Sequence, residues 1–239
     1  MKTLLITISL FIAISSCAKK EESDESGSSN QTNTSFGKFI SVGQTGTILT
    51  SSDGISWDNV SSGSTENLRA VAYGNKTLAI AGYSGTILTS NDAVTWTTRT
   101  SGTSENLGCI SYGNSTFVAV GNSGTIITST DGINWTLRTS GTSKNLWGIT
   151  YGNNKWVTGG DNGSVFSSTD GINWTSRISG TDQELNDVIY KKDKFIFFGY
   201  AGVIITSSDG ITWTSRTSGT VSKLASGALG NNIIVSVGD

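Results

Sequence analysis

The sequence contains no histidine and no proline, has only two cysteines, and is poor in charge, with 14% charged residues among 239. Without histidine, the chain lacks the commonest general base and the commonest metal ligand. Its formal net charge of −2 provides no basic surface for nucleic acid. The two cysteines, Cys17 and Cys109, provide no disulfide framework. We therefore expect no metal, no cofactor and no nucleic-acid partner.

Glycine, by contrast, is abundant: the chain has 30 glycines, and serine, threonine and asparagine fill the gaps between short apolar runs. Short apolar runs interrupted by turn-forming residues are typical of strands rather than helices. The length suits one all-β domain once the ends of the chain are set aside.

One motif, Ser-x-Asp-Gly-x-x-Trp, organises the chain. It occurs five times, with a constant step of 39 residues between successive tryptophans, and one copy carries Ala93 in place of glycine. Its aspartates and tryptophans are Asp53 and Trp57, Asp92 and Trp96, Asp131 and Trp135, Asp170 and Trp174, and Asp209 and Trp213. A fixed period of this size is typical of solenoids, propellers and arrays. Since no insertion breaks the period, each unit is expected to make the same contacts with its neighbours.

Each repeat reads as four short strands. In the unit 107–139 the strands are predicted at 107–112, 116–120, 125–129 and 134–139. An Asp-Gly pair between apolar runs favours a tight turn between the third and fourth strands. Four antiparallel strands in about 39 residues are typical of a propeller blade. The sequence therefore predicts an all-β fold, a β-propeller spanning residues 36–239.

The number of blades depends on the two ends of this region. Phe39 to Val42 aligns with the second strand of a blade, so the first blade lacks its first strand. Leu224 to Leu229 could supply that strand and close a ring of five blades, which is the preferred prediction. Ile233 to Val237 would then duplicate Phe39 to Val42, so the alternative is six blades with incomplete end blades.

The repeated motif has a structural interpretation. Its aspartate can accept hydrogen bonds from turn amides, and the serine two residues earlier can add another. The tryptophan is expected to pack between adjacent blades. Calcium binding is the weaker interpretation, because each turn offers one carboxylate and Ca²⁺ prefers six to eight oxygens.

The N-terminal residues are predicted to be a targeting segment. Residues 1–16 have the basic start and short apolar run of a secretory signal. The run ending in Ile14-Ser15-Ser16-Cys17 resembles a bacterial lipobox, which implies lipidation of Cys17; an ordinary secretion signal is the alternative. Residues 17–35 are then the lipidated cysteine and a disordered polar tether. Because Ala18 follows the cysteine, we expect a lipid-anchored protein of the bacterial cell envelope, at the outer membrane or surface.

The repeats also resemble a known family. The run GTIITSTDGINW is similar to the Asp-box, or bacterial neuraminidase repeat, although the Asp-to-Trp spacing is one residue shorter. Together with GTILTSNDAVTW it resembles propellers similar to the photosystem II stability/assembly factor. The resemblance covers residues 36–239 and implies a propeller with an assembly or binding role.

Sialidase activity does not carry over from this resemblance. Sialidases use an arginine triad, whereas four of the five arginines here recur at one repeat position, three residues after the tryptophan: Arg99, Arg138, Arg177 and Arg216. That position lies on the predicted outer strand, where packing on a tryptophan or pairing with a loop is expected. We therefore predict a protein that is not an enzyme.

A ligand would sit where the repeats differ from one another. The variable positions of the loops and inner strands gather polar and aromatic residues around the predicted channel mouth: Arg69, Tyr83, Asn122, Trp147, Asp161, Asn186, Asp187 and Tyr200. Such a ring suits a sugar or a peptide, although neutral drift in exposed loops would also produce variation. The position of Asp187 is otherwise small (Ala70, Cys109, Gly148 and Ser226), which indicates crowding near the axis.

These observations favour a non-catalytic, lipid-anchored propeller, expected to be a monomer, that binds a protein or glycan partner in scaffolding, assembly or adhesion. The alternative is a divergent glycoside hydrolase or lyase of sialidase-like type, with Asp161 and Asp187 as its carboxyl pair. A purely structural surface protein is the third hypothesis.

Overall fold

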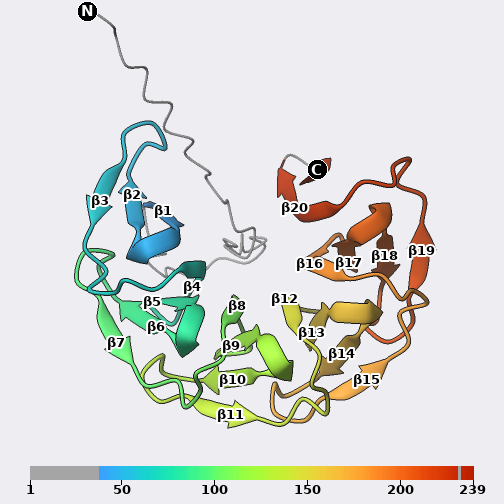
Figure 1. The fold of residues 1–239 in the computed structure, drawn as a ribbon, viewed down its shortest axis with the longest axis horizontal. Coiled ribbons are helices and arrows are strands. Elements are labelled where there is room, and N and C mark those ends of the chain that lie inside the picture. The colour runs from blue at the N-terminus through green and yellow to red at the C-terminus, as the bar shows by residue number, and fades with distance from the viewer. Residues whose placement is uncertain (1–37, 231–232) are drawn as a thin grey trace, which may run out of the picture.

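The computed structural model describes residues 38–230 and 233–239, in which strands form six antiparallel sheets arranged around a common centre (Figure 1). The predicted all-β propeller is therefore confirmed. The predictions for residues 1–16 and 17–35, including lipidation of Cys17, lie outside the described residues. No helix within the described part of the chain is long and apolar enough to cross a membrane.

Within each sheet, the order of the strands from the centre outward is their order in the chain (Figure 1). The innermost strands are β4 (Leu68–Gly74), β8 (Leu107–Gly113), β12 (Leu146–Gly152), β16 (Leu185–Lys191) and β20 (Leu224–Gly230). The second strands are β1 (Phe39–Val42), β5 (Thr77–Gly82), β9 (Thr116–Gly121), β13 (Lys155–Gly160), β17 (Lys194–Gly199) and β21 (Ile233–Gly238). The third are β2 (Ile48–Ser51), β6 (Ile87–Ser90), β10 (Ile126–Ser129), β14 (Val165–Ser168) and β18 (Ile204–Ser207). The outermost are β3 (Asp58–Val60), β7 (Thr97–Arg99), β11 (Thr136–Arg138), β15 (Thr175–Arg177) and β19 (Thr214–Arg216).

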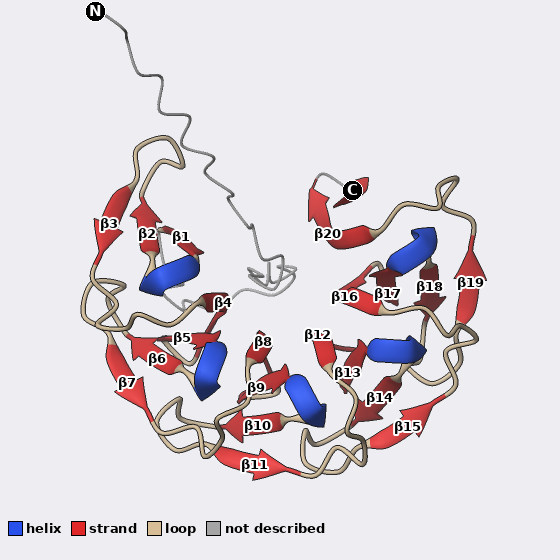
Figure 2. Cartoon of the chain, viewed as in Figure 1, coloured by secondary structure: helices blue, strands red, loops and turns tan. Residues whose placement is uncertain are grey.

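A short 3-10 turn joins the second and third strands of each of the first five sheets (Figure 2). These turns are η1 (Gln44–Gly46), η2 (Tyr83–Gly85), η3 (Asn122–Gly124), η4 (Asp161–Gly163) and η5 (Tyr200–Gly202). In each turn the central residue has a positive φ, between 50° at Thr45 and 54° at Asn162, so every unit repeats the same backbone path.

The sheets do not close into the preferred five-blade ring. The C-terminal strand β20 pairs with β21, from Leu224 opposite Gly238 to Gly230 opposite Ile233, and the first sheet keeps only β1, β2 and β3. Because β21 occupies the free edge of β20, that edge cannot pair with β1. Six sheets, of which the first has three strands and the last has two, agree with the alternative of incomplete end blades.

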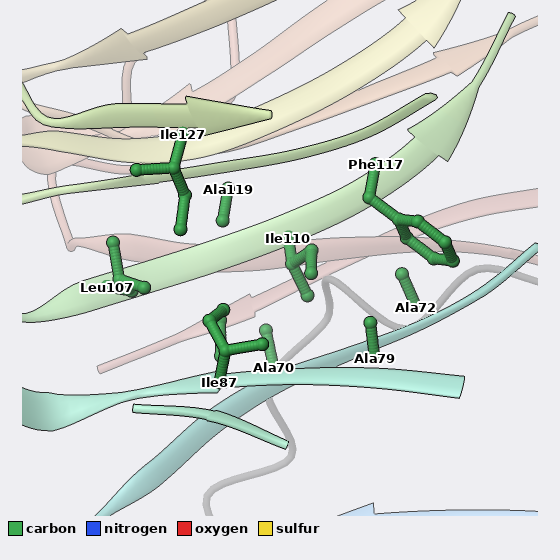
Figure 3. Close-up of a cluster of buried hydrophobic side chains, with 10 residues drawn as sticks. Ala70, Ala72, Ala79, Ile87, Leu107, Ile110, Phe117, Ala119 and Ile127 are labelled. Carbon is green, nitrogen blue, oxygen red and sulfur yellow. The ribbon is translucent and has the colours of Figure 1, made fainter. Parts of the chain in front are cut away.

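The core lies between successive sheets. Between the second and third sheets, small side chains of one face receive large ones of the other (Figure 3). Ala70, Ala72 and Ala79 lie on the second sheet, and Ile110 and Phe117 lie on the third, all of them buried. Each of the four complete sheets therefore packs against a neighbour on both of its faces.

The repeated tryptophans pack at these same junctions. Trp96, Trp135, Trp174 and Trp213 each pack against a cluster formed by their own sheet and the one before it. Trp57 belongs to the first sheet, which has no predecessor among the described residues, and its side chain is 43% exposed.

Glycines at the outer end of the innermost strands allow a second kind of contact. A Cβ placed on Gly74 would overlap the ring of Tyr112 in the next sheet, and Gly113 and Gly152 stand in the same relation to Tyr151 and Tyr190. The recurring Tyr-Gly pair at the end of this strand therefore fits each sheet to its successor.

Candidate functional site

The 3-10 turns and the loops that enter the innermost strands form one face of the propeller, which we call the loop face. Their backbones are hydrogen-bonded to each other in every complete unit: the Tyr83 amide donates to the Asn67 carbonyl at 2.8 Å, and the Asn122 amide to Asn106 at 2.9 Å. The equivalent bonds are Asp161 to Asn145 at 3.0 Å and Tyr200 to Glu184 at 2.9 Å. These repeated backbone bonds fix the position of the first residue of each turn, and therefore the place where its side chain lies on the loop face.

The opposite face carries the Ser-x-Asp-Gly turns, which we call the Asp turns. In the third unit the Asp131 carboxylate accepts hydrogen bonds from the amides of Ile133 and Asn134, both at 2.8 Å, and from the Ser129 hydroxyl at 2.9 Å. These donors favour the ionised form, so they lower the pKa of Asp131. The same bonds occur at the other four Asp turns, so these carboxylates are committed to the turn backbone.

Ala93 adopts the Asp-turn conformation of the glycine that it replaces. Its φ is 60°, against 72° at Gly132, and its amide donates to the Ser90 hydroxyl at 2.9 Å. The turn therefore keeps its type with an alanine in the left-handed region, a conformation that strains L-residues.

Three pairs of side chains on the loop face join a residue of the innermost strand or its entry loop to a 3-10 turn. The Arg69 guanidinium lies over the Tyr83 ring, 5.8 Å from its centroid. The Trp147 indole Nε1 donates to the Asp161 carboxylate at 2.7 Å. The Lys223 ammonium lies 4.7 Å from the centroid of the Tyr200 ring and donates to its hydroxyl at 3.3 Å. Two of these pairs, Arg69 with Tyr83 and Trp147 with Asp161, join predicted site residues within one unit. The third joins the predicted Tyr200 to Lys223 of the next unit.

Trp147 is held on two sides. Its nitrogen bonds to Asp161 of its own sheet, and its ring lies against Gly108, the equivalent position of the preceding sheet, where a Cβ would lie 3.5 Å from the indole. Asn122 follows Gly108 in that preceding unit and is half-buried on the same face. The absence of a side chain at Gly108 leaves room for the half-buried indole, which is consequently fixed before any partner arrives.

The structure does not place Asp187 at the surface, contrary to the prediction. Its side chain is only 3% exposed, and its carboxylate accepts a hydrogen bond from the Gly227 amide of β20 at 3.0 Å. Asn186 also contacts β20, because its side-chain amide donates to the Leu224 carbonyl at 3.1 Å. Both residues therefore tie the fifth sheet to the sixth. A bulge between Leu185 and Asp187 turns the aspartate inward, toward the crowded junction where a Cβ on Gly148 would lie 3.0 Å from the Cα of Asp187.

Two charged residues of the loop face were missed in the sequence. Glu184 lies on the loop before β16, and burial raises the pKa of its carboxyl, with the negative charge of Asp161 raising it further and Lys223 opposing both. Lys223 holds the equivalent position before β20. The signal that could have found them is their repeat position, which is asparagine in the three preceding units: Asn67, Asn106 and Asn145.

The outer arginines serve the sheet itself. The Nε of Arg99, Arg138, Arg177 and Arg216 donates to a hydroxyl of the neighbouring strand at 2.8 to 2.9 Å. These hydroxyls belong to Thr89, Thr128, Ser167 and Thr206, so the arginines bond along the sheet rather than to a tryptophan or a loop. Cys109, on β8, is fully buried.

The arrangement suits recognition better than bond cleavage. A glycosidase uses two carboxyl groups that face one substrate, but Asp187 is buried and bonded to β20 while Asp161 is bonded to Trp147. The exposed features of the loop face are an oriented indole, two tyrosines with cations over their rings, and the carboxylates Asp161 and Glu184.

Comparison with known proteins yields structural matches alone. No protein-family model matches the sequence, and no curated protein matches it. The fold is similar to YCF48 bound to a D1 peptide, with 16% identity over 84% of this chain and 71% of that one and a TM-score of 0.67. It is also similar to YCF48 from Cyanidioschyzon merolae (12% identity, 84% and 89%, TM-score 0.55) and to the WD40 β-propeller domain of Doa1 (18% identity, 84% and 71%, TM-score 0.64). At these identities the matches establish a β-propeller fold.

Proposed function

We propose that this chain is a non-catalytic propeller that binds a protein partner through its loop face. The observation that carries the proposal is the contrast between the two faces. The Asp turns repeat one set of bonds in all five copies, whereas the same frame on the loop face presents side chains that vary between aromatic, charged and amide types from unit to unit. Oriented tryptophan, tyrosine and arginine side chains are enriched at the energetic centres of protein interfaces.

The structural matches support this proposal without extending to the partner. One of them, YCF48, is a propeller seen with a bound D1 peptide. The Ser-x-Asp-Gly-x-x-Trp turns support the resemblance to Asp-box propellers, since their aspartates bond to turn amides and four of their tryptophans pack between sheets. We infer that the repeated units share one backbone geometry and that the side chains of the loop face determine which partner is bound.

We also propose that a lipid on Cys17 holds the propeller at the bacterial cell envelope, at the outer membrane or surface, as a monomer. The sequence Ile14-Ser15-Ser16-Cys17 after a short apolar run supports this placement. Cys17→Ser should move the protein from the membrane fraction to the soluble fraction and prevent incorporation of a labelled fatty acid. Unchanged fractionation of the variant would leave an ordinary secretion signal as the explanation.

Photo-crosslinking tests the binding function. A photo-reactive residue at Tyr83 should capture the partner in cells, and Trp147→Ala should reduce its capture, because the variant removes the oriented indole. Leu137→Ala is the matched control, since Leu137 is a large apolar side chain that is 56% exposed on the outer strand β11. Equal capture by wild type and Trp147→Ala, or turnover of a fluorogenic glycoside that is lost in Asp161→Asn, would contradict the proposal.

A further inference from the structure

An asparagine side chain caps the 3-10 turn of the preceding unit in three places. The Oδ1 atom of Asn67 accepts the Thr45 amide at 3.1 Å, and Asn106 and Asn145 accept the Ser84 and Ser123 amides at 2.9 and 3.0 Å. Each capped residue is the one with a positive φ at the centre of its turn. The asparagine is therefore part of the scaffold, like the aspartate of the Asp turn.

This capping asparagine is replaced in the next two units. Glu184 and Lys223 occupy its position, and neither side chain bonds to the central turn amide of Asn162 or Ala201 in the described ranges. The backbone nevertheless keeps its path, because the Glu184 carbonyl accepts the Tyr200 amide at 2.9 Å as the asparagine carbonyls do elsewhere. The side chain has changed while the frame has not, so the two charges replace a stabilising contact rather than following a deformation.

Both replacements lie beside residues already placed on the loop face. In the three capped units the side chain at this position reaches the central residue of the preceding turn, so Glu184 lies beside the turn of Asp161. Its own carbonyl accepts the Tyr200 amide. The charge of Asp161 raises the pKa of the Glu184 carboxyl, after burial, and that of Lys223 lowers it. Lys223 lies over the ring of Tyr200, which is 40% exposed, and Asp161 accepts the Trp147 indole. The departures from the repeat thus meet in one place, at the junctions of the fourth, fifth and sixth sheets. We call this group the acidic-aromatic surface: Trp147, Asp161, Glu184, Tyr200 and Lys223.

We propose that the acidic-aromatic surface binds an arginine or lysine side chain of the partner protein. The inference rests on the proposed function and names the chemistry by which it operates. The group contains two carboxylates, Asp161 and Glu184, and one ammonium group, that of Lys223, so it carries one negative charge in excess. An arriving cation supplies that counter-charge on a surface that also carries the aromatic side chains Trp147 and Tyr200.

General chemistry favours a basic side chain over the alternatives. Guanidinium and ammonium groups bind aromatic faces and form strong charge-assisted hydrogen bonds with carboxylates. The intramolecular contact of Lys223 with Tyr200 already shows a cation held over an aromatic ring of this surface. Burial and a neighbouring carboxylate both disfavour the ionised form of Glu184, and a cation placed beside it would favour that form.

Short peptide probes test the proposal directly. Fluorescein-labelled nonapeptides of the form Gly-Ser-Gly-Phe-X-Phe-Gly-Ser-Gly, with X as arginine, lysine, glutamine or glutamate, would be titrated with the folded chain and followed by fluorescence polarisation. The arginine and lysine probes should bind about tenfold more tightly than the glutamine probe. Their advantage should shrink as salt is raised, since exposed charges are screened.

The decisive variant is Glu184→Asn, which restores the residue of the three capped units. It should bring the arginine probe to the level of the glutamine probe, a loss of about tenfold, while urea unfolding shows equal or greater stability. Glu105→Gln is the matched control, because it removes one carboxylate from the same face in another unit and should leave probe binding unchanged. A gain in stability with a loss of binding is not expected of a purely structural residue.

Three results would overturn the inference: equal binding of all four probes, unchanged binding by Glu184→Asn, or binding of sugars on a glycan array in place of the basic probes. The proposed function fails separately. If Glu184→Asn still captures the crosslinked partner in cells and Trp147→Ala does not, the loop face binds a protein by another chemistry. If neither variant affects capture, the loop face is not the binding surface.

Discussion

The Trp147 indole and the Asp161 carboxylate, 14 positions apart in the sequence, are joined by a hydrogen bond of 2.7 Å. The bond crosses from the innermost strand β12 to the turn η4, so it connects the centre of the propeller to its loop face. The bond holds the N–H edge of the indole against the Asp161 carboxylate, while the six-membered ring of the indole lies against Gly108 of the preceding sheet. A single charge-assisted bond therefore orients the largest side chain of the acidic-aromatic surface.

Asp161→Ala should lower the free energy of unfolding by about 1–2 kcal/mol, because the half-buried indole N–H and the Asn145 amide lose their acceptor. Asp161→Asn, which keeps an acceptor oxygen, should have a smaller effect. Urea unfolding monitored by circular dichroism measures both. The exposed Asp182→Ala is the control, and an equal change in Asp161→Ala and Asp182→Ala would show that the bond contributes nothing to stability.

Gly113→Ala should destabilise the propeller by about 1–3 kcal/mol through overpacking. The added methyl would overlap the side chain of Tyr151 in the next sheet, and both positions are parts of a regular junction. Gly102→Ala provides a comparison in a loop, since a Cβ there meets nothing within 4 Å, although its positive φ of 79° strains an alanine. Thermal unfolding that is less affected by Gly113→Ala than by Gly102→Ala would contradict the packing argument.

The Asp turn at Gly132 should accept alanine less readily than the turn at Ala93 does. Gly132 has a φ of 72°, and a Cβ there would lie 3.1 Å from the Thr77 side chain of the preceding sheet. Gly132→Ala is expected to reduce stability by about 1–2 kcal/mol. Ala93→Gly is the reverse change at the one natural exception, and relief of strain should offset part of its lost burial. Equal stability of wild type and Gly132→Ala, measured in urea, would show that the turn carries no such restriction.

Stability should fall as the pH is lowered below about 5, because the Asp-turn carboxylates are hydrogen-bonded only in the folded state. Turn amides lower the pKa of Asp92 and Asp209 to about 2, below the ordinary value of 3.8. Because the pKa of these carboxyls is lower in the folded state than in the unfolded state, their stabilisation is complete at a pH above the unfolded pKa. It is lost as the pH falls through the folded pKa, so the decrease in stability should lie between about pH 5 and pH 2. Urea unfolding at pH 6, 4 and 3 should show a smaller decrease for Asp92→Asn than for the wild type.

The matched control for this pH dependence is Asp58→Asn, at an exposed strand position outside the Asp turns. Its decrease in stability should match that of the wild type. If Asp92→Asn and the wild type lose the same amount of stability between pH 6 and pH 3, the turn amides do not govern the acid response.

The repeat made most of the architecture predictable. A step of 39 residues and the Asp-Gly turn located the strands of the type unit, and the predicted strand at 116–120 is observed at Thr116–Gly121. The predicted strand at 134–139 is shorter in the structure, Thr136–Arg138, because the Asp turn extends through Asn134 and Trp135 follows it. The number of blades was harder to predict, because it depends on whether β20 pairs with β21 or with β1. The sequence of one repeat contains no information on pairing between the two ends of the chain.

The site was predictable only as a set of positions. Variation between units singled out Trp147 and Asp161, but the bond between them depends on the open space at Gly108 in another sheet. Asp187 was misplaced because a bulge beside Leu185 turns it into the junction. The small residues at the equivalent positions of the other units indicated this crowding, but the aspartate was still assigned to the surface. Glu184 was missed because the sequence does not show that the asparagine at this position accepts a hydrogen bond from a turn amide of the preceding unit.

The indoles of Trp96, Trp135, Trp174 and Trp213 pack against the sheet that precedes their own as well as against their own. A chain leaves the ribosome from its N-terminus, so every such indole emerges when the surface that receives it has already been synthesised. The propeller can thus be assembled in the order of translation, with each finished sheet serving as the template on which the next one condenses.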